Sequence, residues 1–164
     1  MLHTVEADWQ RSTAQRKTAA LAKADVEMTA PRILLADDHQ EMLQTLVGIL
    51  EDEFQIVGTA GNGMRALELA ASLTPDIVVL DISMPEVNGI EAAWRLREEG
   101  SLARVVFLTA HNDADLVEAA MSAGALGYVL KSHLATDLVS AIWQALVGKT
   151  FISPSINPAG ELGT

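Results

Sequence analysis

Five polar side chains that could do chemistry stand at the ends of short apolar runs of the sequence. They are Asp37 and Asp38, Asp81, Thr109 and Lys131. Taken singly, an Asp or Thr in such a place is usually a helix cap or a turn former, and a Lys is usually a solvated charge. Three carboxylates gathered at one place would repel each other by about 4 kcal/mol per pair at ~4 Å and an effective dielectric constant near ~20. Such a group requires a cation.

Magnesium suits this set of residues best. One lysine can pair with one carboxylate, and the other two suit a hard divalent cation with oxygen ligands. The sequence has no cysteine, and no pair of histidines lies near these positions, which makes zinc a poor candidate. Magnesium, a hydroxyl, a lysine and a spare carboxylate are the groups that phosphoryl transfer needs. Because a carboxylate can accept a phosphoryl group as an acyl phosphate, the centrally placed Asp81 is the predicted acceptor.

The elements that must position these residues alternate regularly from residue 32 onward. Short apolar runs rich in β-branched residues are separated by longer segments of helical periodicity. The predicted strands are 32–36, 55–60, 76–80, 104–108 and 127–130, and the predicted helices are 40–52, 62–73, 88–99, 113–123 and 135–147. This order predicts one parallel sheet with helices on both faces and the 55–60 strand at an edge. Ligand sites in such sheets lie beyond the carboxyl ends of the strands, where the five polar residues fall.

Composition and charge exclude several classes of protein. The chain has 164 residues, of which 49% are hydrophobic, so it can build a core. No apolar run approaches the ~18 residues of a membrane span and no secretory signal opens the chain, so we expect a cytoplasmic protein without membrane contact. Acidic and basic residues cancel over 1–27, and the rest of the chain carries the net charge of −11. Without a basic cluster, direct nucleic-acid binding by this chain is not expected.

The sequence suggests three parts. Residues 1–30 form an N-terminal extension, flexible or helical, which is either a frayed segment or start-site artefact, or a helix that binds a partner or dimerises. Residues 31–150 form the phosphoacceptor domain. Residues 151–164, with prolines and glycines, are predicted to be a linker or tail that adds no further element.

Five ordered segments carry a resemblance to a known family. They are "LLADDH", "VGTAGNG", "PDIVVLDISMPEVNG", "VVFLTAH" and "AGALGYVLK". Over roughly residues 31–155 the chain resembles the receiver domain of two-component response regulators. The resemblance implies a doubly wound, flavodoxin-like (βα)5 fold with the strand order 2-1-3-4-5. It also implies a signalling protein, not an enzyme beyond self-catalysed phosphotransfer and dephosphorylation, that takes its phosphoryl group from a histidine kinase or phosphotransfer protein.

The resemblance also implies roles at the predicted magnesium site. Asp81 is similar to the phosphoacceptor of the family, and Asp37 and Asp38 are similar to the acidic pair that holds Mg2+ with it. The backbone carbonyl of Ser83 is implied as a further metal ligand. Lys131 resembles the lysine that contacts the phosphoryl group.

Further roles concern switching and lifetime. Thr109 is similar to the hydroxyl that moves toward the phosphoryl group, and Tyr128 to the aromatic residue whose rotamer follows it. Ser83 and His111 occupy positions that tune dephosphorylation in the family. Phosphorylation is expected to change the face built by the 113–123 helix, the 127–130 strand and the 135–147 helix, for partner binding or homodimerisation. The simpler interpretation of the histidines is a solvated loop position for each of His39, His111 and His133.

Alternatives remain at the level of output and of reaction. The segments "ADDHQEML", "GYVLKSH" and "GKTFISP" resemble regulators whose receiver precedes a helix-turn-helix domain. The chain is therefore expected to be either a free-standing receiver or the input half of a DNA-binding transcription regulator. An aspartate-dependent phosphatase of the haloacid dehalogenase type would need a second Asp where Ser83 stands. A flavin binder is disfavoured because Asp37 and Asp38 would repel its phosphate.

Overall fold

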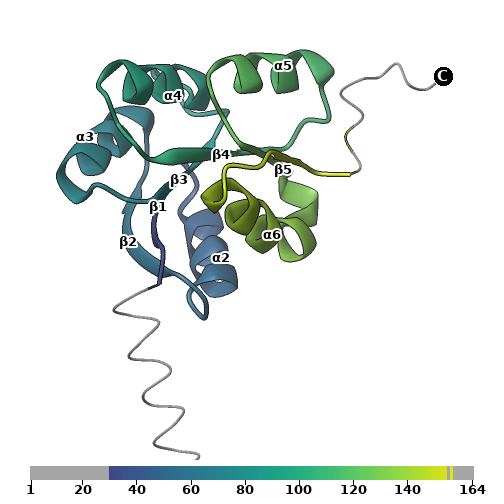
Figure 1. Cartoon of the computed structure of the whole chain (residues 1–164), viewed down its shortest axis with the longest axis horizontal. Helices are drawn as coiled ribbons and strands as arrows, with labels where there is room; N and C mark the ends of the chain where they lie inside the picture. The colour runs from purple at the N-terminus through teal and green to yellow at the C-terminus, as the bar shows by residue number, and fades with distance from the viewer. Residues whose placement is uncertain (1–29, 155, 157–164) are drawn as a thin grey trace, which may run out of the picture.

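A six-stranded parallel sheet with helices on both faces forms the centre of the protein, in a computed structural model that describes residues 30–154 and 156 (Figure 1). The elements in chain order are β1 (Arg32–Ala36), α2 (Gln40–Leu50), β2 (Gln55–Ala60), α3 (Gly63–Leu73), β3 (Ile77–Asp81), α4 (Gly89–Glu98), β4 (Arg104–Thr109), α5 (Ala114–Ser122), β5 (Gly127–Leu130), the 3-10 turn η1 (Lys131–His133), α6 (Leu134–Leu146) and β6 (Phe151–Ile152). The sheet order is β2-β1-β3-β4-β5-β6, so the predicted order 2-1-3-4-5 is confirmed and extended by one strand.

Each face of the sheet is covered by its own set of helices. Helices α3, α4 and α5 lie on one side of the strands, and α2 and α6 lie on the other (Figure 1). Leu34 and Leu80 pack in the core on the first side, whereas Leu35 and Val79, their chain neighbours, pack in the core on the second. Successive side chains of a strand point to opposite faces, so a strand covered on both faces must be apolar throughout. The partly exposed β2 lies at an edge, as predicted.

Polar caps fix where the helices begin and end. The Asn62 side chain accepts a hydrogen bond from the backbone N–H of Arg65, and Asn88 accepts one from Glu91, so α3 and α4 start in the same way. Gly124 follows the end of α5 with φ of +91°, the left-handed conformation in which helices commonly end at a glycine. These local signals place the helix boundaries close to the predicted ones.

The prediction that residues 151–164 add no element is wrong for the first residues of that stretch. Phe151–Ile152 forms β6, which pairs in parallel with β5. The buried Ser153 hydroxyl accepts the N–H of Leu130 at 3.0 Å and donates to Asp137 in α6 at 2.7 Å. Ile156 joins the core. A two-residue strand carries no periodic signal in the sequence, and its formation depends on the free backbone groups at the edge of β5.

Two expectations about chain organisation remain predictions. The division at residues 30 and 150 is one. The other is the flexible or helical extension over 1–30, which lies, apart from residue 30, outside the described residues. Among the helices of the described part, none combines the length and hydrophobicity that crossing a bilayer requires.

Candidate functional site

The ends of β1 and β3 place two aspartates side by side. These neighbouring strands pair in register up to Ala36 and Leu80, so the next residues, Asp37 and Asp81, reach the carboxyl edge of the sheet at the same level. Both are almost fully buried, with exposures of 0% and 1%. Asp38 follows in the loop that leads into α2 and is more exposed. The three carboxylates that the sequence singled out therefore meet at one place.

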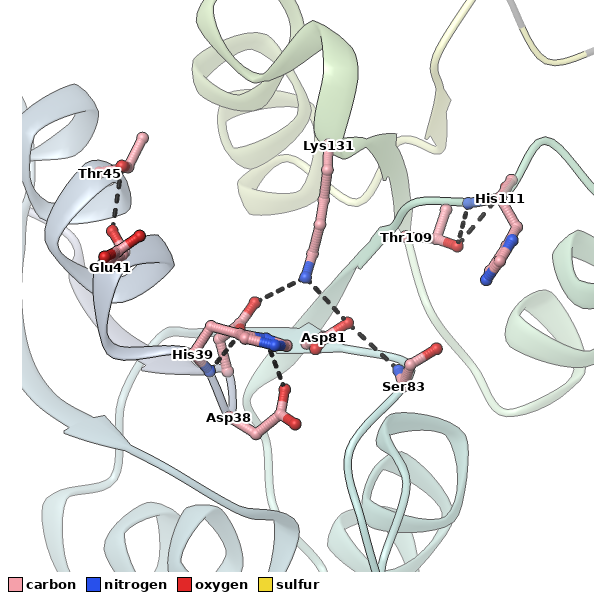
Figure 2. Close-up of polar contacts among 10 residues, drawn as sticks. Asp38, His39, Glu41, Thr45, Asp81, Ser83, Thr109, His111 and Lys131 are labelled. Carbon is pink, nitrogen blue, oxygen red and sulfur yellow. Dashed lines mark hydrogen bonds and ion pairs between the residues drawn. The ribbon is translucent and has the colours of Figure 1, made fainter.

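Lys131 completes this group from the end of β5, two strands away from β3 at the same edge of the sheet. It is the first residue after β5, and its side chain points toward Asp81 (Figure 2). Its Nζ lies 2.8 Å from Asp37 Oδ2 and 3.3 Å from Asp81 Oδ1. Burial alone would lower the pKa of Lys131, but the hydrogen bond to Asp37 and the charges of both aspartates raise it above the usual value. Lys131 is therefore a cation at every physiological pH.

The environment of Asp81 works against its negative charge. Burial raises the pKa of Asp81 to about 6, and the charge of Asp37 acts in the same direction, while Lys131 and the N–H of Ser83 oppose the rise. The Ser83 N–H donates to Asp81 Oδ1 at 3.2 Å, the same oxygen that Lys131 contacts. Both contacts thus fall on one carboxylate oxygen.

The donor set fits a hard divalent cation. One ligand atom from each of Asp37, Asp38, His39 and Asp81 lies within 4.8 Å of every other. Three of the four are carboxylate oxygens, the ligands that Mg2+ prefers. A cation would also offset the repulsion that raises the pKa of Asp81. The role of the Ser83 carbonyl as a further ligand stays a prediction.

The structure brings one residue into this cluster that the sequence assigned to solvent. His39 Nδ1 lies 3.1 Å from Asp38 Oδ1 and 3.4 Å from Asp37 Oδ1, and the ring lies over the carboxylates (Figure 2). The backbone N–H of His39 also donates to Asp37 Oδ1 at 2.8 Å. The only signal in the sequence was its position directly after the acidic pair.

Thr109 lies on the same edge of the sheet but is turned away from the carboxylates. Its Oγ1 accepts the backbone N–H of His111 at 3.0 Å, so the hydroxyl is held by its own loop (Figure 2). Thr109 is 1% exposed and ends β4, next to β3 in the sheet. The structure therefore does not bring Thr109 or His111 into contact with Asp81.

Tyr128 lies beneath this edge, inside the sheet. It pairs with Phe107 across β4 and β5 and is 0% exposed. Among the described residues, its hydroxyl is the one fully buried side-chain N or O atom that has no hydrogen-bond partner. Burial raises the pKa of Tyr128, and the nearby Thr109 side chain partly offsets this rise. A buried hydroxyl without a partner costs free energy, and a ring position that gave the hydroxyl a partner would recover that cost.

Gly89 supports the site in a way that the sequence did not reveal. It begins α4, and its N–H donates to the carbonyl of Ile82 at 2.9 Å. A Cβ atom at Gly89 would lie 2.4 Å from the carbonyl oxygen of Asp81. Only a glycine therefore lets α4 start so close to the end of β3.

Comparisons with known proteins agree with this geometry. A family model described as the response regulator receiver domain matches residues 33–143. The chain is 40% identical over 130 residues to the nitrate/nitrite response regulator protein NarL of Escherichia coli (strain K12), which covers 77% of this chain and 59% of that protein. It is also 40% identical over 120 residues to the transcriptional regulatory protein PdtaR of Mycobacterium tuberculosis, which covers 72% of this chain and 58% of that protein. The chain thus spans about three fifths of these relatives.

Solved structures point the same way. A two-component response regulator of the LuxR family from Aurantimonas sp. SI85-9A1 superposes with a TM-score of 0.78 at 34% identity, covering 83% of this chain and all of that one. The signal receiver domain of the putative response regulator NarL from Mycobacterium tuberculosis gives a TM-score of 0.70 at 31% identity, covering 73% of this chain and 98% of that one. The chain belongs to the response regulator receiver domain family, whose members accept a phosphoryl group in two-component signalling.

Proposed function

We propose that Asp81 is the residue of this receiver domain that accepts the phosphoryl group, from the phosphohistidine of a sensor histidine kinase or phosphotransfer protein. The observation that carries this proposal is the arrangement around Asp81. It is the carboxylate that lies next to both Lys131 and Asp37, at the end of a central strand. Lys131 and the Ser83 N–H both hold its Oδ1, which leaves Oδ2 to attack phosphorus.

The transfer itself requires little covalent chemistry from the protein. A carboxylate oxygen of Asp81 attacks the phosphorus, and a P–O bond forms while the P–N bond to the donor imidazole breaks. The electron pair of the broken bond stays on the donor nitrogen. Because the pKa of Asp81 is about 6, the carboxylate is mostly ionised at neutral pH and can act as the nucleophile. The Lys131 ammonium lies close enough to stabilise charge on the phosphoryl oxygens.

Asp37 and Asp38 would hold Mg2+ together with Asp81, and the resemblance adds the backbone carbonyl of Ser83. When bound, the metal neutralises charge on the transferring group. The residues themselves align the acceptor. Asp37 fixes Lys131 through its Oδ2, and Asp38, being exposed, is free to adjust.

Thr109 and Tyr128 are the proposed switch. Thr109 Oγ1 accepts the N–H of His111 and is turned away from Asp81, so we propose that the side chain rotates toward the phosphoryl group, which breaks this contact and moves the loop that leads into α5. The Tyr128 hydroxyl has no partner to give up, so the ring can follow. The surface that would change is formed by α5, β5 and α6, and we propose that a partner or a second copy of the chain binds there. Ser83 and His111 would tune the lifetime of the acyl phosphate.

A second candidate concerns the output of the whole protein. The relatives NarL and PdtaR are a response regulator and a transcriptional regulatory protein by name, and this chain spans 59% and 58% of their lengths. The second name and the partial coverage favour the input half of a transcription regulator over a free-standing receiver. Sequencing the gene in both directions from this segment distinguishes the two.

Phosphorylation with a small-molecule donor tests the central proposal. Acetyl phosphate and Mg2+ should add the mass of one phosphoryl group, and hydroxylamine should remove it because the product is an acyl phosphate. Asp81→Asn should abolish the added mass, whereas Asp52→Asn, an exposed aspartate beyond α2, should keep it. Chelation of the metal should suppress transfer. A phosphorylated Asp81→Asn protein would show that another residue is the acceptor.

A further inference from the structure

His39 directs a ring nitrogen at the same carboxylates that would hold a metal ion. Its Nδ1 is 3.1 Å from Asp38 Oδ1 and 3.4 Å from Asp37 Oδ1. The His39 side chain is 73% exposed, so the ring can rotate without disturbing the core. Figure 2 shows the dashed contact between the imidazole and the Asp38 carboxylate. The predicted metal site therefore has a nitrogen donor as well as oxygen donors.

A nitrogen donor changes which cations a site prefers. Mg2+ favours oxygen ligands and binds imidazole weakly, whereas first-row transition metals bind imidazole well, with affinity rising from Mn2+ toward Ni2+ and Cu2+. We infer that His39 is a metal ligand that adds affinity for divalent transition-metal ions at this site while adding little for Mg2+. This inference rests on the proposed metal site of Asp37, Asp38 and Asp81 and adds a residue and a cation class to it.

The distances suit a shared ion. Ligand atoms at ~2.0–2.2 Å from one ion lie at most about 4.4 Å apart, and the four candidate atoms lie within 4.8 Å of one another. Small side-chain rotations are therefore sufficient to close the site. The His39 and Lys131 contacts also fall on different oxygens of Asp37, Oδ1 and Oδ2 respectively. A metal could replace the His39 contacts while Lys131 stays in place.

A simpler role for His39 predicts the opposite result. If the ring acted only as a positively charged partner of the carboxylates, it would compete with every divalent cation. Removing it would then strengthen the binding of Mg2+ and Ni2+ alike. If Nδ1 is a ligand, removing it weakens the binding of Ni2+ and leaves the binding of Mg2+ nearly unchanged. The direction of the change in affinity therefore decides between the two roles.

Titration calorimetry of the full chain with Mg2+ and with Ni2+ measures this direction. In His39→Gln the Ni2+ affinity should fall on the order of tenfold or more, about 1.4 kcal/mol, while Mg2+ affinity changes far less. His133→Gln, which removes an exposed histidine that has no assigned role at the site, is the matched control and should leave Ni2+ affinity unchanged. Pulsed electron paramagnetic resonance of the Mn2+ complex should show coupling to an imidazole nitrogen that is lost in His39→Gln.

The outcomes separate this inference from the proposed function. Equal losses for both metals, an increase for both, or retained nitrogen coupling in His39→Gln would overturn the role of His39. Mg2+ binding that depends on Asp38 and Asp81 would still support the phosphoacceptor site in that case. If Asp38→Asn and Asp81→Asn bind Mg2+ and Ni2+ as the unchanged protein does, the metal site itself is wrong, and the inference falls with it.

Discussion

Replacing Asp81 by Asn should make the metal-free protein more stable at neutral pH, although the same change removes the proposed phosphoacceptor. The carboxylate of Asp81 is 1% exposed, and it lies beside the fully buried Asp37. Burial and this repulsion raise its pKa to about 6, so Lys131 offsets only part of the cost of the charge. Asn has nearly the same shape and no charge, so the substitution removes that cost.

The pKa shift sets the size and the pH dependence of the effect. The folded state binds the proton more tightly than the unfolded chain does, so this group stabilises the fold at low pH and the contribution is lost as pH rises from about 4 through about 6. The change of the Asp81 pKa from 3.8 to about 6 corresponds to about 3 kcal/mol. The free energy of unfolding of Asp81→Asn should therefore be higher than that of the unchanged protein by up to about 3 kcal/mol at pH ~7.5, and by less than about 1 kcal/mol at pH ~4.

Urea unfolding in the presence of a chelator at both pH values measures this difference. Asp52→Asn, at an exposed position in the turn after α2, is the control and should change stability by less than about 0.5 kcal/mol at either pH. Adding Mg2+ should reduce the difference in stability between Asp81→Asn and the unchanged protein, because the metal stabilises only a folded state that binds it. An Asp81→Asn protein that is equally stable or less stable than the unchanged one at neutral pH would refute the electrostatic reasoning.

Two further predictions concern contacts that hold the site and its flank. Ser153→Ala removes the hydroxyl that donates to the buried Asp137 of α6, so the free energy of unfolding should fall by about 1–3 kcal/mol. Ser140→Ala, on the exposed side of α6, is the control and should leave thermal denaturation nearly unchanged. Equal losses of stability in both variants would contradict the role of the Ser153 contact. Gly89→Ala places a Cβ 2.4 Å from the carbonyl oxygen of Asp81, the last residue of β3, so it should lower both the stability and the phosphorylation rate. Gly48→Ala, in the open middle of α2, is the control and should stabilise the protein by about 0.5–1 kcal/mol in the same urea assay. A Gly89→Ala protein as stable as Gly48→Ala would show that α4 can shift.

The alternation of strands and helices could be predicted because each element carries a periodic signal of its own. The near-continuous apolar runs of β1 and β3 indicated strands buried on both faces, and the Gln and Thr side chains of β2 indicated an edge. Asn62 and Asn88, the first residues of two predicted helices, are the N-caps of α3 and α4. The general rule that strand ends meet at one edge then predicted that Asp37, Asp81 and Lys131 would lie together.

What the sequence by itself determined was therefore the architecture and the membership of the acidic cluster. Only the tertiary structure decided that Asp37 and Asp81 are buried while Asp38 is exposed, that His39 faces the carboxylates, and that Thr109 is turned onto the backbone of His111. It also decided that residues after 150 add a strand at the edge of β5. Periodicity reports which face of an element is apolar, whereas burial and side-chain direction depend on contacts between residues far apart in the chain. The pairing of Lys131 with Asp37, across 94 positions, is such a contact, because its geometry follows from sheet register.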